Sequence, residues 1–238
     1  MEEKLRDEPV PANYKKVKNS VPYYGLAATI PPAVFGKIAS ASTCFGKKPP
    51  SPKRQSLSLD HLNFLINMTF AQTDQVSMYA TGTHVRKAVP SGGARHPTEA
   101  YLLVNDGVTD VEPGCYHYNA KFHRLDRLAV TAAHTKKAIR AATLVPRARE
   151  FPVAVPFLHS CIFERSMFRY REARSYRVIN LDLGHIHANQ ALCARMLGLA
   201  YNECYSVAEN ELEAILCLDP LHESVMSSFV LHGEKSDV

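Results

Sequence analysis

The chain has 238 residues, of which 46% are hydrophobic and 21% are charged, and its formal net charge is +5. These values are ordinary for one globular domain with elaborations, and the scattered positive charge gives little support for a nucleic-acid partner. The chain opens with Met-Glu-Glu-Lys and contains no apolar run near the roughly 20 residues of a membrane span, so we expect a cytoplasmic protein without a membrane segment.

Metal binding is not expected. None of the six cysteines forms a CxxC or CxxxC pair, which argues against structural zinc and iron–sulfur sites. The thiols are expected to be reduced, as in a cytoplasmic protein. His185 and His187 lie two residues apart in a predicted helix and so point to different faces, which favours core or capping roles over a metal pair.

Two regions are expected along the chain. Residues 1–56 are rich in proline, lysine and serine, and their prolines exclude long helices. We expect this N-terminal extension to pack on the body or on a partner chain. A single folded domain is expected over residues 57–238, and it begins with a helix that Ser58 caps. Residues 72–89 are polar and poorly periodic, which predicts a loop.

Short apolar strands then alternate with helices, which predicts an α+β fold with a mixed sheet. Pro156 argues against a central strand through residues 153–163, because proline has no N–H group for the ladder. Gly198 marks the end of the longest helix. The predicted elements are a strand over 100–105, a hairpin of 115–118 and 122–128, a helix over 131–143, a β-rich segment over 153–163, a helix over 180–199 and a strand over 224–232.

A glycine-bearing loop, Pro90-Ser91-Gly92-Gly93, is the first candidate for a site. Adjacent glycines allow a flat ligand or a phosphate to approach the backbone closely, and Arg86, Arg95 and His96 add donors nearby. A Gly-Gly pair alone marks a turn more often than a site. Neither a GxGxxG fingerprint nor a P-loop is present, so no dinucleotide or nucleoside-triphosphate motif supports the loop.

Three blocks, in order, carry a resemblance to a known family. Residues 86–104 resemble the loop-plus-strand signature of SagB-type dehydrogenases, a branch of the flavin-binding nitroreductase-like fold. The hairpin sequence Glu112-Pro-Gly-Cys-Tyr-His-Tyr-Asn119 resembles the next block of that family. Phe163-Glu-Arg-Ser-Met-Phe-Arg-Tyr-Arg171, with Asp182-Leu-Gly-His185 after it, resembles the third.

The resemblance implies a dimer with a central mixed, mainly antiparallel sheet flanked by helices and with FMN between the subunits. A homodimer is expected, and a heteromeric complex stays open. It also implies oxidation of an azoline-type ring in a peptide or carrier-bound peptide of natural-product biosynthesis. In such a reaction a base takes a proton from carbon and the flavin takes a hydride. A general NAD(P)H-dependent nitroreductase has little support, since no separate nicotinamide motif is visible.

Particular residues inherit roles from the resemblance. The loop residues are expected to lie against the flavin, Arg86 and Arg95 to meet its phosphate or a polar edge, and Asn189 to make a further contact. Apart from the resemblance, Asp182 is a candidate partner for a nearby arginine. The expected cofactor-binding residues are therefore Arg86, Pro90, Ser91, Gly92, Gly93, Arg95 and Asn189.

The expected catalytic pair departs from the family pattern. The family has lysine followed by tyrosine, and this chain has Arg169-Tyr170. Arginine stays protonated and is a poor general base, although it can steer an anion. Either Tyr170 works alone, or the substrate differs, or azoline oxidation is lost. An equally good interpretation of residues 169–177 is a solvated cationic face.

Two further departures favour an alternative function. The segment Ser40–Phe45 lacks the arginines that grip the FMN phosphate in the family, and Ala200–Ser206 lacks the glycine that the family has close to the flavin. The alternative is a degenerate, non-redox subunit, or a peptide-binding partner in a modification complex.

Overall fold

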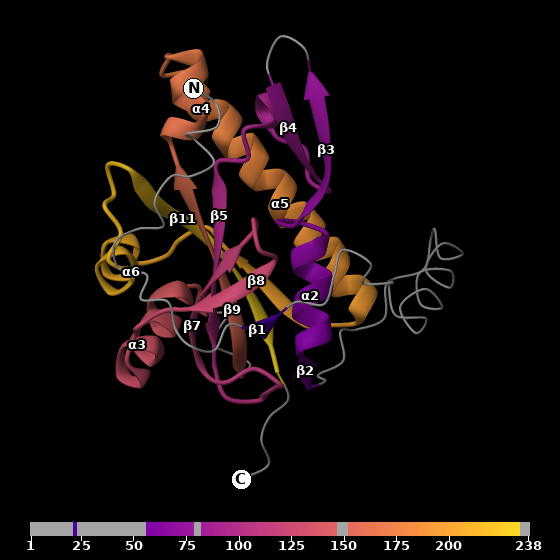
Figure 1. Cartoon of the computed structure of the whole chain (residues 1–238). Coiled ribbons are helices and arrows are strands. Elements are labelled where there is room, and N and C mark those ends of the chain that lie inside the picture. The colour runs from indigo at the N-terminus through magenta and orange to yellow at the C-terminus, as the bar shows by residue number, and fades with distance from the viewer. Residues whose placement is uncertain (1–20, 23–55, 79–81, 147–151, 234–238) are drawn as a thin grey trace, which may run out of the picture.

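The computed structural model describes residues 21–22, 56–78, 82–146 and 152–233. A seven-stranded sheet forms the centre of the molecule (Figure 1), and all of its neighbouring strands pair antiparallel. Across the sheet the strands are β1 (Val21–Pro22), β8 (Arg124–Arg127), β7 (Gly114–Asn119), β5 (Thr98–Val104), β9 (Val153–Ile162), β11 (Glu223–His232) and β10 (Tyr201–Cys204).

Helices cover both faces of this sheet. One hydrophobic core lies between the sheet and the pair α2 and α5, and a second lies between the sheet and the pair α3 and α6. Figure 1 shows the two pairs on opposite sides of the strands. The helices are α2 (Leu59–Asn67), α3 (Ala132–Ala142), α4 (Glu164–Tyr170), α5 (Ser175–Leu197) and α6 (Glu209–Leu216).

The period of two along the central strands explains the two cores. Successive strand residues point to opposite faces, so Phe157 joins the α2/α5 core while Leu158 joins the α3/α6 core. Phe229 and Val230 of β11 divide in the same way. The expected α+β fold with a mainly antiparallel sheet flanked by helices is therefore confirmed.

Smaller elements surround the sheet. β2 (Leu57–Ser58) pairs parallel with β6 (Val108–Thr109), and the 3₁₀ turn η2 (Gly92–Ala94) lies between β4 (Gly82–Lys87) and β5. Within the described ranges, no helix is both long and apolar enough to cross a membrane.

The helix ends agree well with the sequence analysis. Ser58 caps α2, and its backbone N–H donates to Nδ1 of His61 at 3.1 Å. Gly198 ends α5 with a left-handed φ of 72°. α5 begins at Ser175, earlier than the expected Asn180, and the polar or exposed residues 175–177 give no apolar stripe that would mark this start.

Two expectations were wrong. Residues 72–89 are not a loop, since β3 (Gln72–Met78) and β4 (Gly82–Lys87) form an antiparallel hairpin. Its residues are mostly exposed, so the apolar alternation that marks a half-buried strand is missing. Pro156 does lie in a central strand: the pairing of β9 with β5 ends at Phe157, while the pairing with β11 continues through Pro156.

Most of the N-terminal region lies outside the described residues, and so does the segment Ser40–Phe45. The exceptions are residue 56 and β1, which pairs antiparallel with β8 through Val21 and Leu125. The division of the chain near residue 56 stays a prediction.

Candidate functional site

The glycine loop is fastened to helix α5 through one carboxylate. Ser91 Oγ donates to Asp182 Oδ2 at 2.6 Å, and the Gly92 backbone N–H donates to Asp182 Oδ1 at 3.0 Å. Ser91 Oγ also accepts from the backbone N–H of His96 at 2.8 Å, which closes the turn. Asp182 therefore anchors the loop. The sequence analysis expected it to pair with an arginine, but its hydrogen bonds among the described residues go to Ser91 and Gly92.

Both loop glycines lie close to side chains from elsewhere in the chain. A Cβ on Gly92 would collide with Val178 of α5, and a Cβ on Gly93 would collide with the Tyr170 hydroxyl. Gly93 also has a φ of 64°, which a side chain makes costly. The chain thus brings the expected catalytic Tyr170 to the expected flavin-contacting Gly93, while Tyr170 stays 43% exposed.

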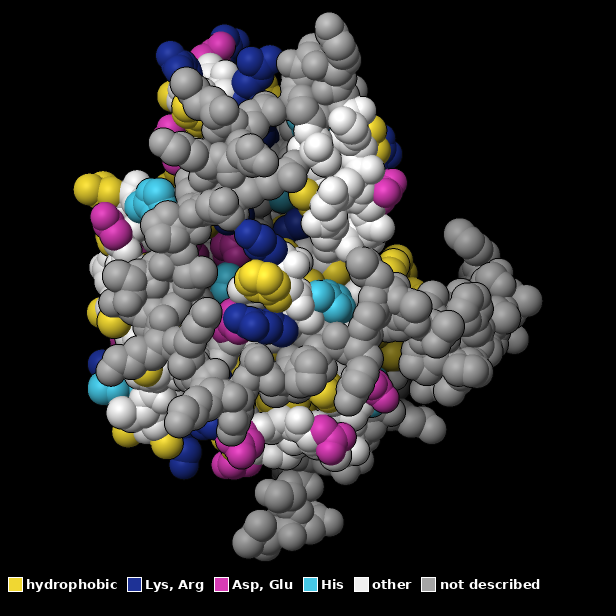
Figure 2. All heavy atoms as spheres, in the orientation of Figure 1, with side chains coloured by type: hydrophobic (Ala, Val, Ile, Leu, Met, Phe, Trp, Pro, Cys, Tyr) yellow, Lys and Arg dark blue, Asp and Glu magenta, His cyan; other side chains and the backbone are white. Residues whose placement is uncertain are grey.

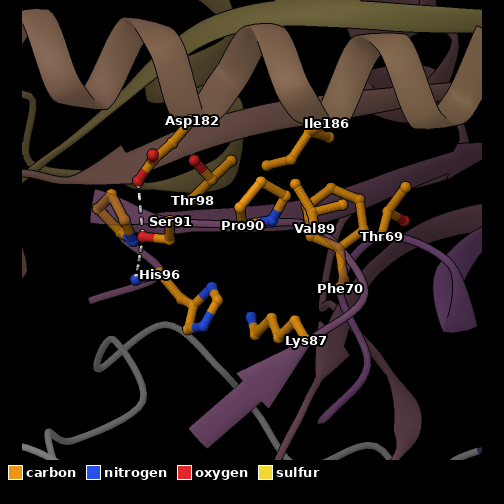
Figure 3. Close-up of a pocket in the computed structure, with 11 residues that line it drawn as sticks. Thr69, Phe70, Lys87, Val89, Pro90, Ser91, His96, Thr98, Asp182 and Ile186 are labelled. Atoms are coloured by element: carbon orange, nitrogen blue, oxygen red, sulfur yellow. Dashed lines mark hydrogen bonds between the residues drawn. The ribbon is translucent and has the colours of Figure 1, made fainter. Parts of the chain in front are cut away.

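A small pocket lies beside this loop (Figure 3). Its volume of about 10 Å³ suits one water molecule or the tip of a larger ligand. Its walls come from the end of β4, the glycine loop, the start of β5, α5 and the turn after α2. The lining includes Phe70, Lys87, Ser91, His96, Asp182 and Ile186.

Lys87 is the cation of this pocket. In Figure 3 its ammonium points toward His96. Desolvation lowers the pKa of Lys87 to about 8, although the Glu99 carboxylate acts against this and Arg165 adds to it. Burial, and then the charge of Lys87, lower the pKa of His96 to about 4, so His96 is neutral at pH 7.

Glu99 is already fully engaged. Its Oε1 accepts from Arg165 of α4, and its Oε2 pairs with His117 Nε2 at 2.7 Å. Burial alone would raise the pKa of Glu99, but Arg165 and His117 outweigh burial and hold it below its usual range. Glu99 therefore stays ionised and leaves no oxygen in contact with Lys87.

The remaining expected site residues lie around the loop at different depths. Arg86 and Pro90 are exposed, and Arg169 is exposed at the end of α4. Arg95 is partly buried, and its Nε has no hydrogen-bond partner among the described residues. Asn189 donates from Nδ2 to the Met68 carbonyl at 2.9 Å and so ties α5 to the end of α2. Its expected flavin contact stays a prediction.

Arginines at the end of α4, in the turn after it and at the start of α5 form an exposed cationic surface. Figure 2 shows Lys and Arg side chains gathered at the α4 end of the molecule. The exposed residues of this cationic surface are Arg169, Arg171, Arg174 and Arg177.

A buried polar cluster lies between the sheet and α5. Ser227 Oγ lies 3.0 Å from His159 Nδ1 and 2.8 Å from His187 Nε2. Burial lowers the pKa of His159 well below its ordinary value and lowers that of His187 to about 4. His187 thus has the core role that the sequence analysis favoured, whereas His185 is exposed.

The segment after α5 adds bulk at the edge of this cluster. Tyr205 is 63% exposed, and its ring lies 4.7 Å from the His187 ring, centroid to centroid. Its hydroxyl donates to Glu203 Oε2 at 2.7 Å. Across the part of the chain that the structure describes, no group of three or more His, Cys, Asp or Glu side chains could hold a metal ion.

The donor set around the loop fits the polar parts of FMN. A phosphate and the edge of an isoalloxazine ring need cations and donors that the protein has not already used. Lys87 forms no hydrogen bond or ion pair with another described residue, and Arg95 Nε has no partner. A pocket of about 10 Å³ does not by itself enclose the ring.

Sequence reasoning missed Lys87. It adjoins the exposed Arg86, and the sequence pattern of residues 72–89 predicts a loop. The alternation of β4 separates the two side chains, since Arg86 is exposed and Lys87 is partly buried. Recognising the strand would have indicated that Lys87 points inward.

No family model matches the chain. It is 50% identical over 237 residues to the trifolitoxin-processing protein TfxB of Rhizobium leguminosarum bv. trifolii, with 99% of this chain and 63% of that protein covered. It is 27% identical over 149 residues to the microcin B17-processing protein McbC of Escherichia coli, with 61% of this chain and 51% of that protein covered. The chain therefore spans about half to two thirds of these relatives.

Two solved structures resemble the model along nearly the whole chain. A putative nitroreductase from Anabaena variabilis has a TM-score of 0.67 at 22% identity, covering 95% of this chain and 41% of that one. A chain of the E. coli microcin synthetase McbBCD complex with truncated pro-MccB17 bound has a TM-score of 0.64 at 20% identity, covering 99% and 81%.

Proposed function

Because the chain is a SagB-type protein of the nitroreductase-like fold, we propose that it is an FMN-dependent oxidoreductase that dehydrogenates an azoline-type ring in a peptide or carrier-bound peptide. One observation carries the proposal. The glycine loop is held by Asp182 of α5, and the Tyr170 hydroxyl lies against Gly93 of that loop. Two of the three blocks that define the family resemblance thus form one site.

The peptide substrate comes from the relatives. Both of the processing proteins named above are described by the peptide that they process, trifolitoxin or microcin B17. The E. coli complex is described with a truncated peptide precursor bound. We infer a peptide intermediate of natural-product biosynthesis as substrate, with the exposed cationic surface after α4 as a candidate contact for acidic parts of such a peptide.

The residues that would hold FMN are those with unused donors beside the loop. Arg86 and Arg95 suit its phosphate or its pyrimidine edge, and the backbone of residues 90–93 offers a flat surface. When bound, FMN would accept two electrons from the substrate as a hydride. Tyr170 is placed to hold or pass a proton at the edge of the loop, and Arg169 beside it to steer an anionic group.

A second subunit is part of the proposal. The pocket beside the loop does not enclose a flavin ring, and we propose that another chain supplies the opposite wall. A homodimer is the simplest arrangement. The likeness to one chain of a multi-protein synthetase supports a heteromeric complex as the other form.

The alternative proposal is a non-redox subunit that binds a peptide or a partner. The exposed Tyr205 favours it, because this ring covers His187 where the family has glycine close to the flavin. A chain of this kind would keep the fold but would not turn over substrate.

The visible spectrum of the purified protein separates the two proposals. After reconstitution, alone and with its natural partner proteins, the protein should retain one FMN per active unit and remove two hydrogens from an azoline peptide by mass spectrometry. Tyr170→Phe should lower turnover, whereas Tyr176→Phe, an exposed tyrosine on α5, should not. A protein that stays colourless in every combination contradicts the redox proposal and supports the alternative.

A further inference from the structure

The proposed dehydrogenation needs a group that accepts a proton from carbon. Arginine at position 169 cannot do this, because it stays protonated. The base must therefore be another titratable side chain that faces the glycine loop. This inference rests on the proposed function and adds a residue role to it.

Lys87 has the right place. It lies at the end of β4, in the wall of the pocket that also contains Ser91 and His96 (Figure 3). The pocket opens beside the loop to which Tyr170 is fitted. A proton from a ring held at the loop would reach Lys87 Nζ directly or through the single water that a volume of about 10 Å³ accommodates.

Lys87 also lacks the partners that would keep it a structural cation. The carboxylates nearest to the pocket are both committed: Glu99 to Arg165 and His117, and Asp182 to Ser91 and Gly92. Lys87 makes no hydrogen bond and no ion pair within 4.0 Å to any residue in the described ranges.

The surroundings favour a neutral amine. The groups that face Lys87 are Glu99 of β5, Arg165 of α4, and His96 of the turn before β5, which is neutral at pH 7. Desolvation and the Arg165 charge outweigh Glu99, so the pKa falls to about 8. A fraction of Lys87 is therefore unprotonated near neutral pH, and that fraction grows as the pH rises.

We propose that Lys87 is the proton acceptor of this site, in the role that Arg169 cannot fill. In the step, a ring C–H bond breaks and its proton forms a new N–H bond on Nζ, which gives an ammonium. The electron pair left on carbon forms the new ring double bond as a second hydrogen leaves with its electrons as hydride. The hydride acceptor is the flavin of the proposed function, and the ammonium returns its proton to water.

The test uses the full-length protein, reconstituted with FMN and any required partner. Lys87→Arg keeps the positive charge and removes the base, and Lys87→Met removes both. Lys136→Met, an exposed lysine of α3, is the matched control. We expect Lys87→Arg, which keeps the positive charge, to lower kcat by about 100-fold or more while folding stays as in the wild type. The control should keep wild-type kcat.

Two pH measurements separate a base from a structural cation. The wild-type rate should rise with pH through an apparent pKa of about 8, and this limb should vanish in Lys87→Arg. Competitive acetylation of the wild-type protein, read lysine by lysine by mass spectrometry, should give Lys87 a midpoint near pH 8 without any need for turnover.

The outcomes are distinct. An active wild type with Lys87→Arg within about threefold of its kcat overturns this inference alone and leaves the dehydrogenase intact. An acetylation midpoint for Lys87 near its ordinary value of 10.5 overturns it as well. If the wild type binds FMN and every natural partner but turns over no azoline peptide, the proposed function fails and the role of Lys87 fails with it.

Discussion

The Tyr170 hydroxyl occupies the space that a Cβ on Gly93 would need. Gly93→Ala should therefore displace Tyr170 from the loop and also strain a backbone with a φ of 64°. We expect at least about a tenfold loss of turnover, because the catalytic geometry tolerates little displacement. The measurement is kcat/KM with an azoline peptide.

Gly107→Ala is the control for that experiment. Gly107 has a φ of 92° but no atom within 4 Å of an added Cβ, so the substitution adds strain without a collision. The control should lose some stability and keep its turnover. Equal loss of turnover in both variants would show that Tyr170 has no special relation to the loop.

Asp182→Asn should loosen the glycine loop. An amide keeps only one acceptor oxygen, so Ser91 Oγ and the Gly92 N–H, which now bond both carboxylate oxygens, would have to share it. We expect the free energy of unfolding to fall by about 1–3 kcal/mol and FMN affinity to fall with it. Urea unfolding and flavin fluorescence titration measure the two effects. The exposed Asp106→Asn should change neither, and similar behaviour of both variants would contradict the anchoring role.

The buried histidine cluster predicts acid sensitivity. The folded pKa of His187 is about 4 and its ordinary value is 6.5, so the unfolded chain binds more protons between these values. Stability is then complete above pH 6.5 and is lost as the pH falls toward 4. The contribution of His187 to this loss is about 3 kcal/mol at most.

His187→Gln should flatten that pH dependence in denaturant unfolding at constant salt. His159, in contact with His187, has its pKa lowered in the same direction and should keep part of the slope. His185→Gln, exposed on the same helix, should leave the slope as in the wild type. A slope unchanged in His187→Gln would mean that His187 is not neutral in the fold.

Thiol reactivity should divide the described cysteines into two groups. Burial raises the pKa of Cys115 to about 11 and those of Cys161 and Cys193 to about 12, and it also raises that of Cys204. Cys217 is exposed. Brief alkylation of the native protein should therefore modify Cys217 and spare the other four until urea is added, as peptide mapping would show. Rapid native labelling of Cys161 would contradict the packing of β9.

Elements could be predicted from the sequence where their own residues include a capping residue, a terminating glycine or an apolar periodicity. The cap at Ser58 and the stop at Gly198 follow from local chemistry, so the ends of α2 and α5 could be placed. The exposed hairpin of β3 and β4 could not, since its pairing is not accompanied by apolar alternation. Pro156 was a misleading signal, because a proline disrupts a strand only where its missing N–H would bond a neighbour. Here the pairing of β9 with β5 already ends at Phe157.

The site shows the same division. The loop of residues 90–93 could be recognised from its glycines and its family resemblance. Its attachment to Asp182, about ninety positions away, and the isolation of Lys87 both depend on long-range packing that no local pattern records. Only the structure shows that Glu99 and Asp182 are already hydrogen-bonded to groups other than Lys87.

The central strand β9 carries neighbouring residues that serve opposite faces of the sheet. His159 meets Ser227 and His187 beneath α5, while Ser160 Oγ donates to Glu223, at 2.5 Å, on the face that carries Tyr101. A bulge between Val225 and Ser227 of β11 directs these two residues to different faces. A shift of β9 by one residue would turn His159 and Ser160 to the opposite faces of the sheet, and both would lose their polar partners. The two clusters together therefore favour one pairing register of β5, β9 and β11 when the sheet forms.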